Sequence, residues 1–346
     1  MSSAIPKAVL YFSPLSVWSA AVLLTLVEKG YGDDEIDRKQ VDLSSGDNFD
    51  PAFLRLNPKA TVPTLVVPVE KTLAEGVESR YKALAETATI IEFLDKSRSA
   101  MSRTHTTSSA PAPALAPATI AFAAKTKSII DDLHSDDANP NHLRYMNARN
   151  DAALRSLAGE ILHALTGRQK ALANYISDAE QEQIQVSVKT KAFWQEKKAA
   201  VDSLLEVVEN AHKAETELDE EGKIKRAAFY AEARRAWEVA LKDALVKVNN
   251  EIIGPYSLGD QFSIADLHLA SWLARVAKLA GGAYENDGSA AIGKLEEHIG
   301  GGFALAKDFQ VEDGNGTARY HSKLGAFWDA MKKRKSWKVV YEQGLY

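Results

Sequence analysis

A proline at the head of an apolar run, Val62-Pro63-Thr64-Leu65, constrains the fold of this chain more than any other feature. Because proline has no N–H to donate to a β-ladder, it belongs at a sheet edge, at the first position of a strand or in a cis turn. The backbone N–H and C=O groups of Val62 are then free to pair with an extended peptide. The run therefore predicts a strand from Thr64 onwards beside a peptide-binding edge.

A second motif, Glu86-Thr87, opens the next apolar helical run. A helix N-terminus presents unpaired N–H groups and partial positive charge, which favour a carboxylate. The hydroxyl of Thr87 adds one more polar contact. Together with the Val62-Pro63 turn, this pair predicts a pocket for a small anionic peptide.

Composition limits the classes of function. A length of 346 residues is comfortable for two domains. The formal net charge of -5 gives no global basic field, so nucleic acid is not expected as a partner. There is no cysteine, which removes disulfides, thiolate metal sites and any cysteine nucleophile. The eight histidines show no close pair at metal-ligand spacing, so no metal is expected either.

The apolar stretch 8–27 is the only candidate for a targeting segment. Pro14 and several serines interrupt it, so it is better interpreted as a strand, a turn and a helix than as a signal peptide. No other stretch approaches transmembrane length. We therefore expect a cytoplasmic protein with no membrane partner.

Hydrophobic periodicity predicts a mixed first part and a helical second part. The first part has the order βαβαββα, in which a parallel pair of strands is followed by a β-hairpin and a covering helix. The expected strands are 8–12, 36–43, 64–69 and 81–84, and the expected helices are 17–28, 51–56 and 88–94.

These elements suggest a domain of residues 1–96, a linker of residues 97–117 and an all-helical domain of residues 118–346. The linker is rich in Ser, Thr, Ala and Pro, which is typical of a surface segment. In the last domain, a period of 3.6 residues predicts helices at 118–134, 152–176, 178–214, 224–253 and 264–279, and the Gly-rich stretch 281–302 is expected to be partly loop.

The last of these helices carries a capping motif. Ser263 is predicted to cap its N-terminus, and Asp266, at the third helical position, is predicted to return the bond. Phe262 is placed to pack on Leu267 as a hydrophobic staple.

These three motifs, in this order and at these separations, resemble the glutathione transferase superfamily, most strongly over 8–95 and 259–276. The resemblance implies a thioredoxin-like first domain, a helical-bundle second domain with the acceptor-substrate site, and a cis peptide before Pro63. It implies that Val62 pairs main chain to main chain with the cysteinyl part of glutathione. Glu86 and Thr87 would hold the γ-glutamyl end of this co-substrate.

The resemblance also implies a residue that activates the thiol near the start of the first helix. Counting back from 23–30 places Ser16 at the position used by serine-type members, with Ser13 and Ser19 as the other candidates. Lowering a thiol pKa of about 8.5 by two units needs about 2.7 kcal/mol, and one hydroxyl hydrogen bond supplies roughly 1.5–3 kcal/mol. The alternative interpretation is that Ser16 only caps the helix.

The chain departs from serine-type relatives where the glycine end of glutathione would be anchored. Thr61 stands where Gln or Lys is common, and Asn48-Phe49 stands where some relatives have a basic residue. Asn48, Lys59 and Lys39 are the candidate anchors, and each has the alternative of being an ordinary surface residue.

The acceptor site has no motif, because helix faces form it. Trp18, which lies two residues after Ser16, is expected at its mouth, and Tyr145 and Trp237 are candidates for its walls. The stretches 68–80 and 136–176 look longer than a compact member needs, and the large helical domain resembles fungal members.

The resemblance therefore implies a homodimeric glutathione transferase that conjugates the thiolate to hydrophobic electrophiles. Detoxification, secondary metabolism or aromatic ether cleavage would suit such an alkyl or aryl transferase. The alternative is a non-catalytic protein of the same fold that binds ligands or regulates a partner, because fold does not fix function.

Overall fold

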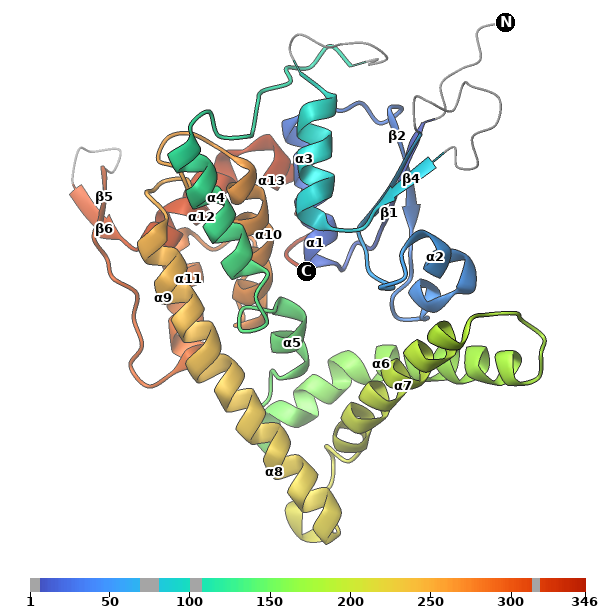
Figure 1. Cartoon of the computed structure of the whole chain (residues 1–346). Helices are drawn as coiled ribbons and strands as arrows, with labels where there is room; N and C mark the ends of the chain where they lie inside the picture. Colours follow the sequence, from blue (N-terminus) through green and yellow to red (C-terminus); the bar gives the residue numbers. More distant parts are fainter. Residues whose placement is uncertain (1–6, 69–80, 100–107, 313–317) are drawn as a thin grey trace, which may run out of the picture.

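A sheet domain and a larger helical region make up the molecule (Figure 1). The computed structural model describes residues 7–68, 81–99, 108–312 and 318–346. The loop expected at 68–80, apart from Pro68, and part of the expected linker therefore lie outside the described residues.

The sheet has the strand order β2-β1-β3-β4. β1 pairs in parallel with β2 and antiparallel with β3, and β3 pairs antiparallel with β4, which confirms the predicted mixed sheet. The strands are β1 (Ala8–Phe12), β2 (Ile36–Gln40), β3 (Thr64–Pro68) and β4 (Tyr81–Leu84).

β2 ends three residues before the predicted end at residue 43. The Asp42 carboxylate accepts hydrogen bonds from the main-chain N–H of Ser44 and from the hydroxyls of Ser44 and Ser45. A side chain that bonds the backbone two residues on favours a turn over a strand. These hydrogen bonds also hold the pKa of Asp42 at about 2.

Three helices cover the sheet, with α1 and α3 on one side and α2 on the other (Figure 1). Leu10 of β1 and Leu65 of β3 are fully buried in the core. Phe53 of α2 packs edge-on against Tyr11, with the ring centroids 5.8 Å apart. These helices are α1 (Val17–Glu28), α2 (Pro51–Leu56) and α3 (Thr87–Ser97), and the 3-10 turn Asp47–Phe49 precedes α2.

Helix α1 also packs against the helical region, where it contacts α10 and α13. α10 (Ile264–Leu279) matches the predicted helix and is buried from Ile264 to Ala277. A helix that is buried on all sides belongs to the centre of a core. α1 and α10 therefore join the two parts of the molecule.

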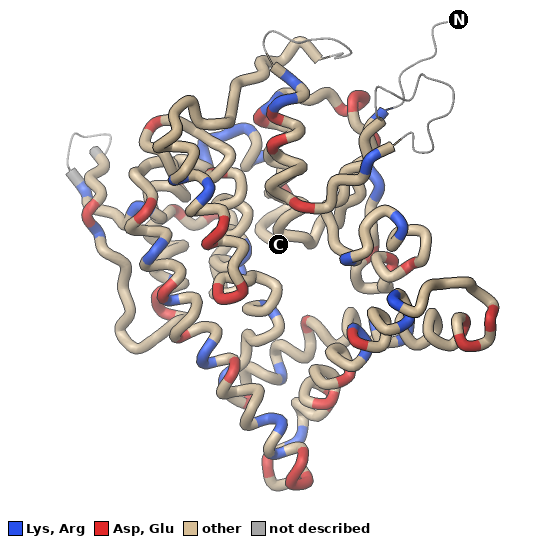
Figure 2. The backbone as a smooth tube through the Cα atoms, in the orientation of Figure 1, with Lys and Arg blue, Asp and Glu red and all other residues tan. Residues whose placement is uncertain are grey.

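The remaining helices build the rest of this region. These helices are α4 (Ile120–Leu133), α5 (Pro140–Tyr145), α6 (Asp151–Glu180), α7 (Val188–Glu209), α8 (Glu220–Arg234), α9 (Leu241–Glu251), α11 (Gly288–Ile299), α12 (Lys323–Lys333) and α13 (Lys335–Val340). Figure 2 shows that Lys and Arg are interspersed with Asp and Glu along these helices. No described helix combines the length and the apolar character that a membrane span needs.

Three predictions for this region need correction. The helix expected from residue 178 starts at Val188, because 181–187 make a turn in which Glu182 has a φ of 58° and Ser187 caps α7. The helix expected at 224–253 starts earlier, because Asp219 caps Glu220–Arg234. The region is also not purely helical, since β5 (Phe309–Glu312) pairs with β6 (Ala318–His321).

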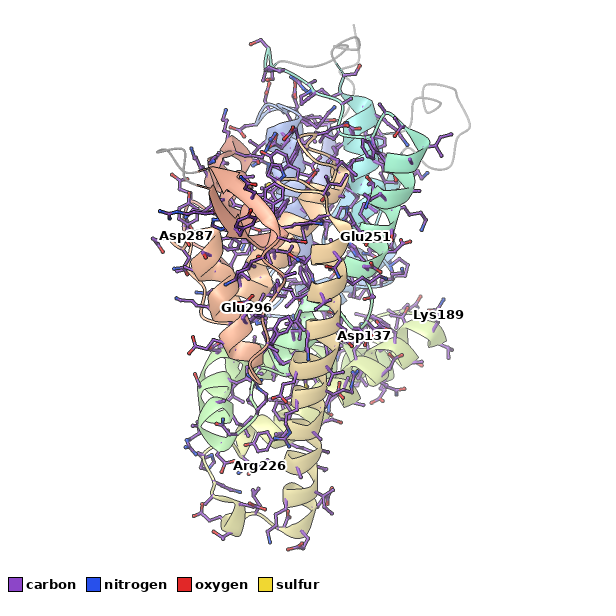
Figure 3. All side chains as sticks on the ribbon, turned by 90° about the vertical axis from the view of Figure 1, so that its left-hand side faces the viewer. Asp137, Lys189, Arg226, Glu251, Asp287 and Glu296 are labelled. Carbon is purple, nitrogen blue, oxygen red and sulfur yellow. The ribbon has the colours of Figure 1, made fainter. Side chains whose placement is uncertain are left out.

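A π-helical segment, Arg235–Ala240, connects α8 to α9. The three form one long rod, with Arg226 near its lower end and Glu251 near its upper end (Figure 3). The apolar period continues through the π segment, so the sequence alone showed a single helix there.

In its described part, residues 108–117, the predicted linker is bound to the first domain by hydrogen bonds. The buried Lys29 ammonium donates to Asp95 at 2.8 Å and to the Pro113 carbonyl at 2.6 Å. The other contacts of the Asp95 carboxylate come from the main-chain N–H groups of Leu115 and Ala116. Burying this pair is tolerable only because these hydrogen bonds satisfy both charges, and they fix the linker to the first domain.

The α6–α7 hairpin reaches across to the sheet domain below α2 (Figure 1). The indole N–H of Trp194 donates to the Phe49 carbonyl at 3.1 Å in a buried contact. Gly167 of α6 lies so close to the loop before α2 that a Cβ there would collide with the Ser44 carbonyl oxygen. The stretch expected as an insertion at 136–176 thus supports the sheet domain.

The Asp266 half of the predicted capping motif of α10 forms, whereas the Ser263 hydroxyl donates to the Asp266 carboxylate instead of accepting a hydrogen bond from the helix N-terminus. The fully buried Asp266 carboxylate accepts hydrogen bonds from Ser263 N at 2.6 Å, from Ser263 Oγ at 2.8 Å and from Ser257 N at 2.7 Å. Its removal would leave buried donors without acceptors, which is the costly way to lose a hydrogen bond.

We expect Asp266→Ala to lower the free energy of unfolding by about 3 kcal/mol, because buried donors are then left unpaired. Denaturant unfolding measures this loss. The matched control is Asp260→Ala, at an exposed acid of the same segment, which should change stability by less than about 0.5 kcal/mol. Equal effects of the two variants would contradict the role given to Asp266.

We expect Gly167→Ala to destabilise the protein by about 1–3 kcal/mol, because the new methyl group forces α6 away from Ser44. Gly159→Ala, in the same helix with open space around it, should instead stabilise by about 0.5–1 kcal/mol. Thermal unfolding of both variants tests the pair. Stabilisation by Gly167→Ala would show that the hairpin does not need this close approach.

Candidate functional site

A cleft of about 270 Å³ lies where the sheet domain meets α5 and α6. The turn before α1, the segment 60–62 and the 3-10 turn before α2 form one wall, and α5 and α6 form the other. Six of the residues predicted from the sequence line it: Ser16, Trp18, Asn48, Thr61, Val62 and Tyr145.

The Val62-Pro63 peptide bond is cis, as the family resemblance implies. Val62 lies before the first residue of β3, whose pairing with β1 begins at Thr64 and Tyr11. Asn57 Nδ2 donates to the main-chain oxygen of Thr61 at 2.8 Å and to Thr64 Oγ1 at 3.1 Å. These bonds hold the turn that presents Val62 to the cleft.

Ser16 caps α1 and also faces Val62. Its hydroxyl oxygen accepts from Ser19 N at 3.2 Å, and the hydroxyl donates to the Val62 carbonyl at 3.4 Å, a long hydrogen bond. Ser19 is fully buried, and its Oγ accepts from Ser13 N at 3.3 Å. Of the three candidate serines, Ser16 is the one that lines the cleft.

Glu86 is the N-cap residue of α3, and Thr87 is the first residue of that helix. The Glu86 side chain makes no capping hydrogen bond, and its carboxylate pairs with Lys59 Nζ at 2.5 Å. Both side chains are exposed, so the pair contributes little to stability. Neither Lys59 nor the Glu86-Thr87 pair lines the cleft.

Asn48 is buried at the edge of the cleft. Its Nδ2 donates to the Ala60 carbonyl at 2.8 Å, whereas its Oδ1 has no hydrogen-bond partner. An unpaired buried acceptor is unfavourable, and this oxygen is itself shielded from solvent. Thr61 Oγ1 accepts from Asn57, and Lys39 lies over the Tyr11 ring, outside the cleft.

Trp18 stacks on His134, with the ring centroids 3.8 Å apart. His134 Nε2 and His268 Nδ1 share a hydrogen bond of 2.9 Å. Desolvation lowers the pKa of His134 to about 4, and burial holds the pKa of His268 well below its ordinary value. Both rings are therefore neutral at pH 7. The sequence did not reveal this pair, because 134 residues separate its members.

The second wall combines one predicted residue with two that sequence reasoning missed. Tyr145 Oη accepts a hydrogen bond from Arg168 Nη1 at 2.6 Å, and Arg144 also lines the cleft. No sequence motif distinguishes these arginines from others on helices. Trp237 is not brought to the cleft, because it is fully buried and packs on His298 at 4.5 Å.

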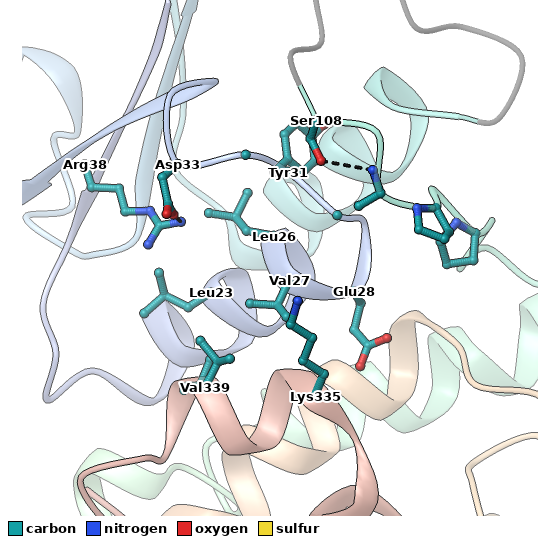
Figure 4. Close-up of a pocket in the computed structure, with 16 residues that line it drawn as sticks. Leu23, Leu26, Val27, Glu28, Tyr31, Asp33, Arg38, Ser108, Lys335 and Val339 are labelled. Carbon is teal, nitrogen blue, oxygen red and sulfur yellow. Dashed lines mark hydrogen bonds and ion pairs between the residues drawn. The ribbon is translucent and has the colours of Figure 1, made fainter.

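A second cavity of about 610 Å³ lies between α1, the segment 108–113 and α13 (Figure 4). Its floor is apolar, with Leu23, Leu26 and Val339. Glu28 on its rim is already paired with Arg334, at 2.6 and 2.7 Å. None of the residues predicted for function lines this cavity.

Metal ligation has no candidate in the described part of the chain, where no three His, Asp or Glu side chains gather as a metal ion would require.

Comparison with known families shows that residues 15–97 match the model of the glutathione S-transferase N-terminal domain. This stretch contains α1, the cis Val62-Pro63 turn and the Glu86-Thr87 pair. The match runs from the turn before α1 to the end of α3, and it leaves β1 and the helical region outside it.

The solved structures that this chain matches include two glutathione transferases and one homologue of such a protein. Glutathione transferase Omega 3C from Trametes versicolor is 18% identical, with 97% of this chain and 85% of that chain covered and a TM-score of 0.45. Glutathione S-transferase III in apo form is 18% identical, with 97% and 95% covered and a TM-score of 0.46. A homologue from Sulfitobacter with bound glutathione is 15% identical, with 97% and 98% covered and a TM-score of 0.45.

We expect the stability of the protein to fall as the pH drops from about 6.5 towards 4. A histidine whose pKa is lowered on folding binds protons better in the unfolded state, so acid favours unfolding in this window. In His134→Gln the decline should be shallower, because one such group is gone. The decline is measured by the free energies of unfolding of both proteins at several pH values.

The control for this prediction is His163→Gln, at an exposed histidine of α6, which should leave the pH dependence of stability unchanged. A decline as steep in His134→Gln as in the unchanged protein would contradict the assignment of His134.

Proposed function

We propose that this protein is a glutathione transferase that binds glutathione along the Val62 edge and transfers its thiolate to an electrophile in the cleft. The observation that carries the proposal is the position of Ser16. Its hydroxyl lies at the start of α1, within 3.4 Å of the Val62 carbonyl, in a cleft next to a cis-proline turn. The family match over residues 15–97 supports the same activity.

In this proposal the extended co-substrate pairs with the main chain of Val62, as a peptide pairs with a sheet edge. Its γ-glutamyl end lies towards the N-terminus of α3, where Glu86 and Thr87 stand. Asn48, which lines the cleft, is the candidate anchor for the glycine end. The Lys59–Glu86 pair must then loosen, at little cost, because both side chains are exposed.

Ser16 would stabilise the thiolate and would not act as a base. Its hydroxyl would turn from the Val62 carbonyl to the sulfur, and the N-terminus of α1 would add roughly 0.3–1 kcal/mol of favourable charge interaction. Catalysis would rest on a lowered thiol pKa and on the positioning of the two reactants. The electrophile would lie between Trp18 and Tyr145, which both line the cleft.

The proposal includes a homodimer and a cytoplasmic location, and it leaves detoxification, secondary metabolism and aromatic ether cleavage as possible settings. The homodimer and these settings rest on the resemblance of the sequence motifs, and the location rests on the interpretation of the stretch 8–27 as a strand, a turn and a helix.

The alternative function is ligand binding without turnover. It is favoured by the hydrogen bonds of Ser16, whose hydroxyl is already used by Ser19 N and the Val62 carbonyl. A serine that only caps α1 would leave the thiol of a bound glutathione at its ordinary pKa.

Ser16→Ala is expected to raise the pKa of bound glutathione by about one to two units and to lower turnover with chlorodinitrobenzene roughly tenfold to hundredfold, because one hydrogen bond to the thiolate is lost. The pH dependence of turnover gives the pKa, and calorimetric titration gives glutathione affinity. Loss of the cap would also cost about 1 kcal/mol of stability.

Ser13→Ala is the matched control, because this serine does not line the cleft, and its turnover should match that of the unchanged protein. Tight glutathione binding without turnover in the unchanged protein would favour the alternative function. Full turnover in Ser16→Ala would remove Ser16 from the mechanism and leave the glutathione site in place.

A further inference from the structure

The charge of the cleft lining is entirely positive. Arg144 of α5 and Arg168 of α6 line it, and no Asp or Glu is among its described lining residues. Elsewhere acidic and basic residues are interspersed, and the chain has a net charge of -5. Two unbalanced cations in a cleft favour an anionic ligand.

Arg168 is held in a fixed orientation. Its Nε donates to the Leu43 carbonyl at 2.7 Å, and its Nη1 donates to Tyr145 Oη at 2.6 Å. Its Nη2 has no hydrogen bond within the described part of the structure. The planar fork therefore loses little conformational entropy when it binds a ligand.

Arg144 is half-buried, and within the described residues its guanidinium makes no hydrogen bond or ion pair. It lies 6.0 Å from the Tyr145 ring centroid, next to the group that Arg168 binds. A partly desolvated cation without an anionic partner is unfavourable, so an anion that reaches Arg144 binds more strongly in the low local dielectric.

A third guanidinium adds to this charge from behind the cleft. The buried Arg275 donates to the Leu15 carbonyl at 2.6 Å, one residue before Ser16. Burial, and then the Arg144 charge, lower the pKa of Arg275 to about 10. Arg144 and Arg275 are thus close enough to repel each other, which increases the benefit of an anion at Arg144.

We propose that Arg144 and Arg168 form a carboxylate-binding site in this cleft. A carboxylate matches the planar donor fork of arginine and binds it through charge-assisted hydrogen bonds. The inference rests on the proposed function, and it names the substrate class: either the acceptor carries a carboxylate, or the glycine carboxylate of glutathione is held by the helical region.

The first arm of the test measures the acceptor without glutathione. Titration calorimetry compares 4-chloro-3-nitrobenzoate with its neutral methyl ester on the full chain. If the acceptor supplies the carboxylate, we expect the acid to bind roughly tenfold to hundredfold more tightly than the ester, and we expect Arg144→Gln to abolish this preference.

The second arm compares glutathione with glutathione whose glycine carboxylate is an ethyl ester. If the glycine end is bound, the preference for free glutathione should be roughly tenfold to hundredfold in the unchanged protein and should be lost in Arg144→Gln. Arg168→Lys, which keeps the charge but not the fork, should lose most of the preference in the same arm.

Arg155→Gln is the matched control, because Arg155 is exposed on the same helix as Arg168 and lies outside the cleft. It should keep every preference of the unchanged protein. Circular dichroism shows whether each variant is folded. If Arg168→Lys does not fold, Arg144→Gln still tests the proposal, because Arg144 makes no hydrogen bond within the described residues.

If the unchanged protein prefers the free carboxylate in one arm and the arginine variants lose that preference, the result supports the site. The arm in which this happens identifies the source of the carboxylate. The proposal is overturned if the unchanged protein shows no preference in both arms, or if its preference survives both arginine variants. A protein that binds no glutathione refutes the proposed transferase, whereas the first arm still decides the carboxylate site.

Discussion

The burial of α1 on two sides is the constraint on which the rest of the structure depends. One side of this helix packs against α3, and other parts of it pack against α10 and α13. Ala21, Val22 and Leu24 are fully buried. Since Ser16 is the N-cap residue of α1, the same packing that joins the sheet domain to the helical region also fixes the candidate site.

Buried charged side chains stabilise the contact between the sheet domain and the helical region. Lys29, at the end of α1, is satisfied by Asp95 of α3 and by the linker carbonyl of Pro113. At the other end of α1, Arg275 of α10 holds the Leu15 carbonyl. Each charge bonds the main chain of a segment distant in sequence, so a change in domain position would leave a buried charge unpaired.

The α6–α7 hairpin gives the cleft the part of its chemistry that a sheet domain alone lacks. Trp194 and Gly167 bring the hairpin against the loop before α2. The same contact brings Arg168 to Leu43 and Tyr145 at the edge of the candidate glutathione site. The positive charge of the cleft thus comes mainly from the helical region, while the cis-proline turn and Ser16 come from the sheet domain.

The sequence by itself determined the elements whose signals are local. The order of the sheet domain and the contact of Asp266 at the start of α10 each follow from neighbouring residues, and the structure confirms them. Pro63 by itself left a sheet edge, a first strand position and a cis turn open, and the structure has the cis turn. Only the tertiary structure decided which side chains meet. His134 with His268, and Arg168 with Leu43, are each more than a hundred residues apart, and Trp237 turned inward to the core instead of to the cleft. The physical reason is that periodicity records which face of a helix is buried, whereas the partner of that face depends on how distant helices pack.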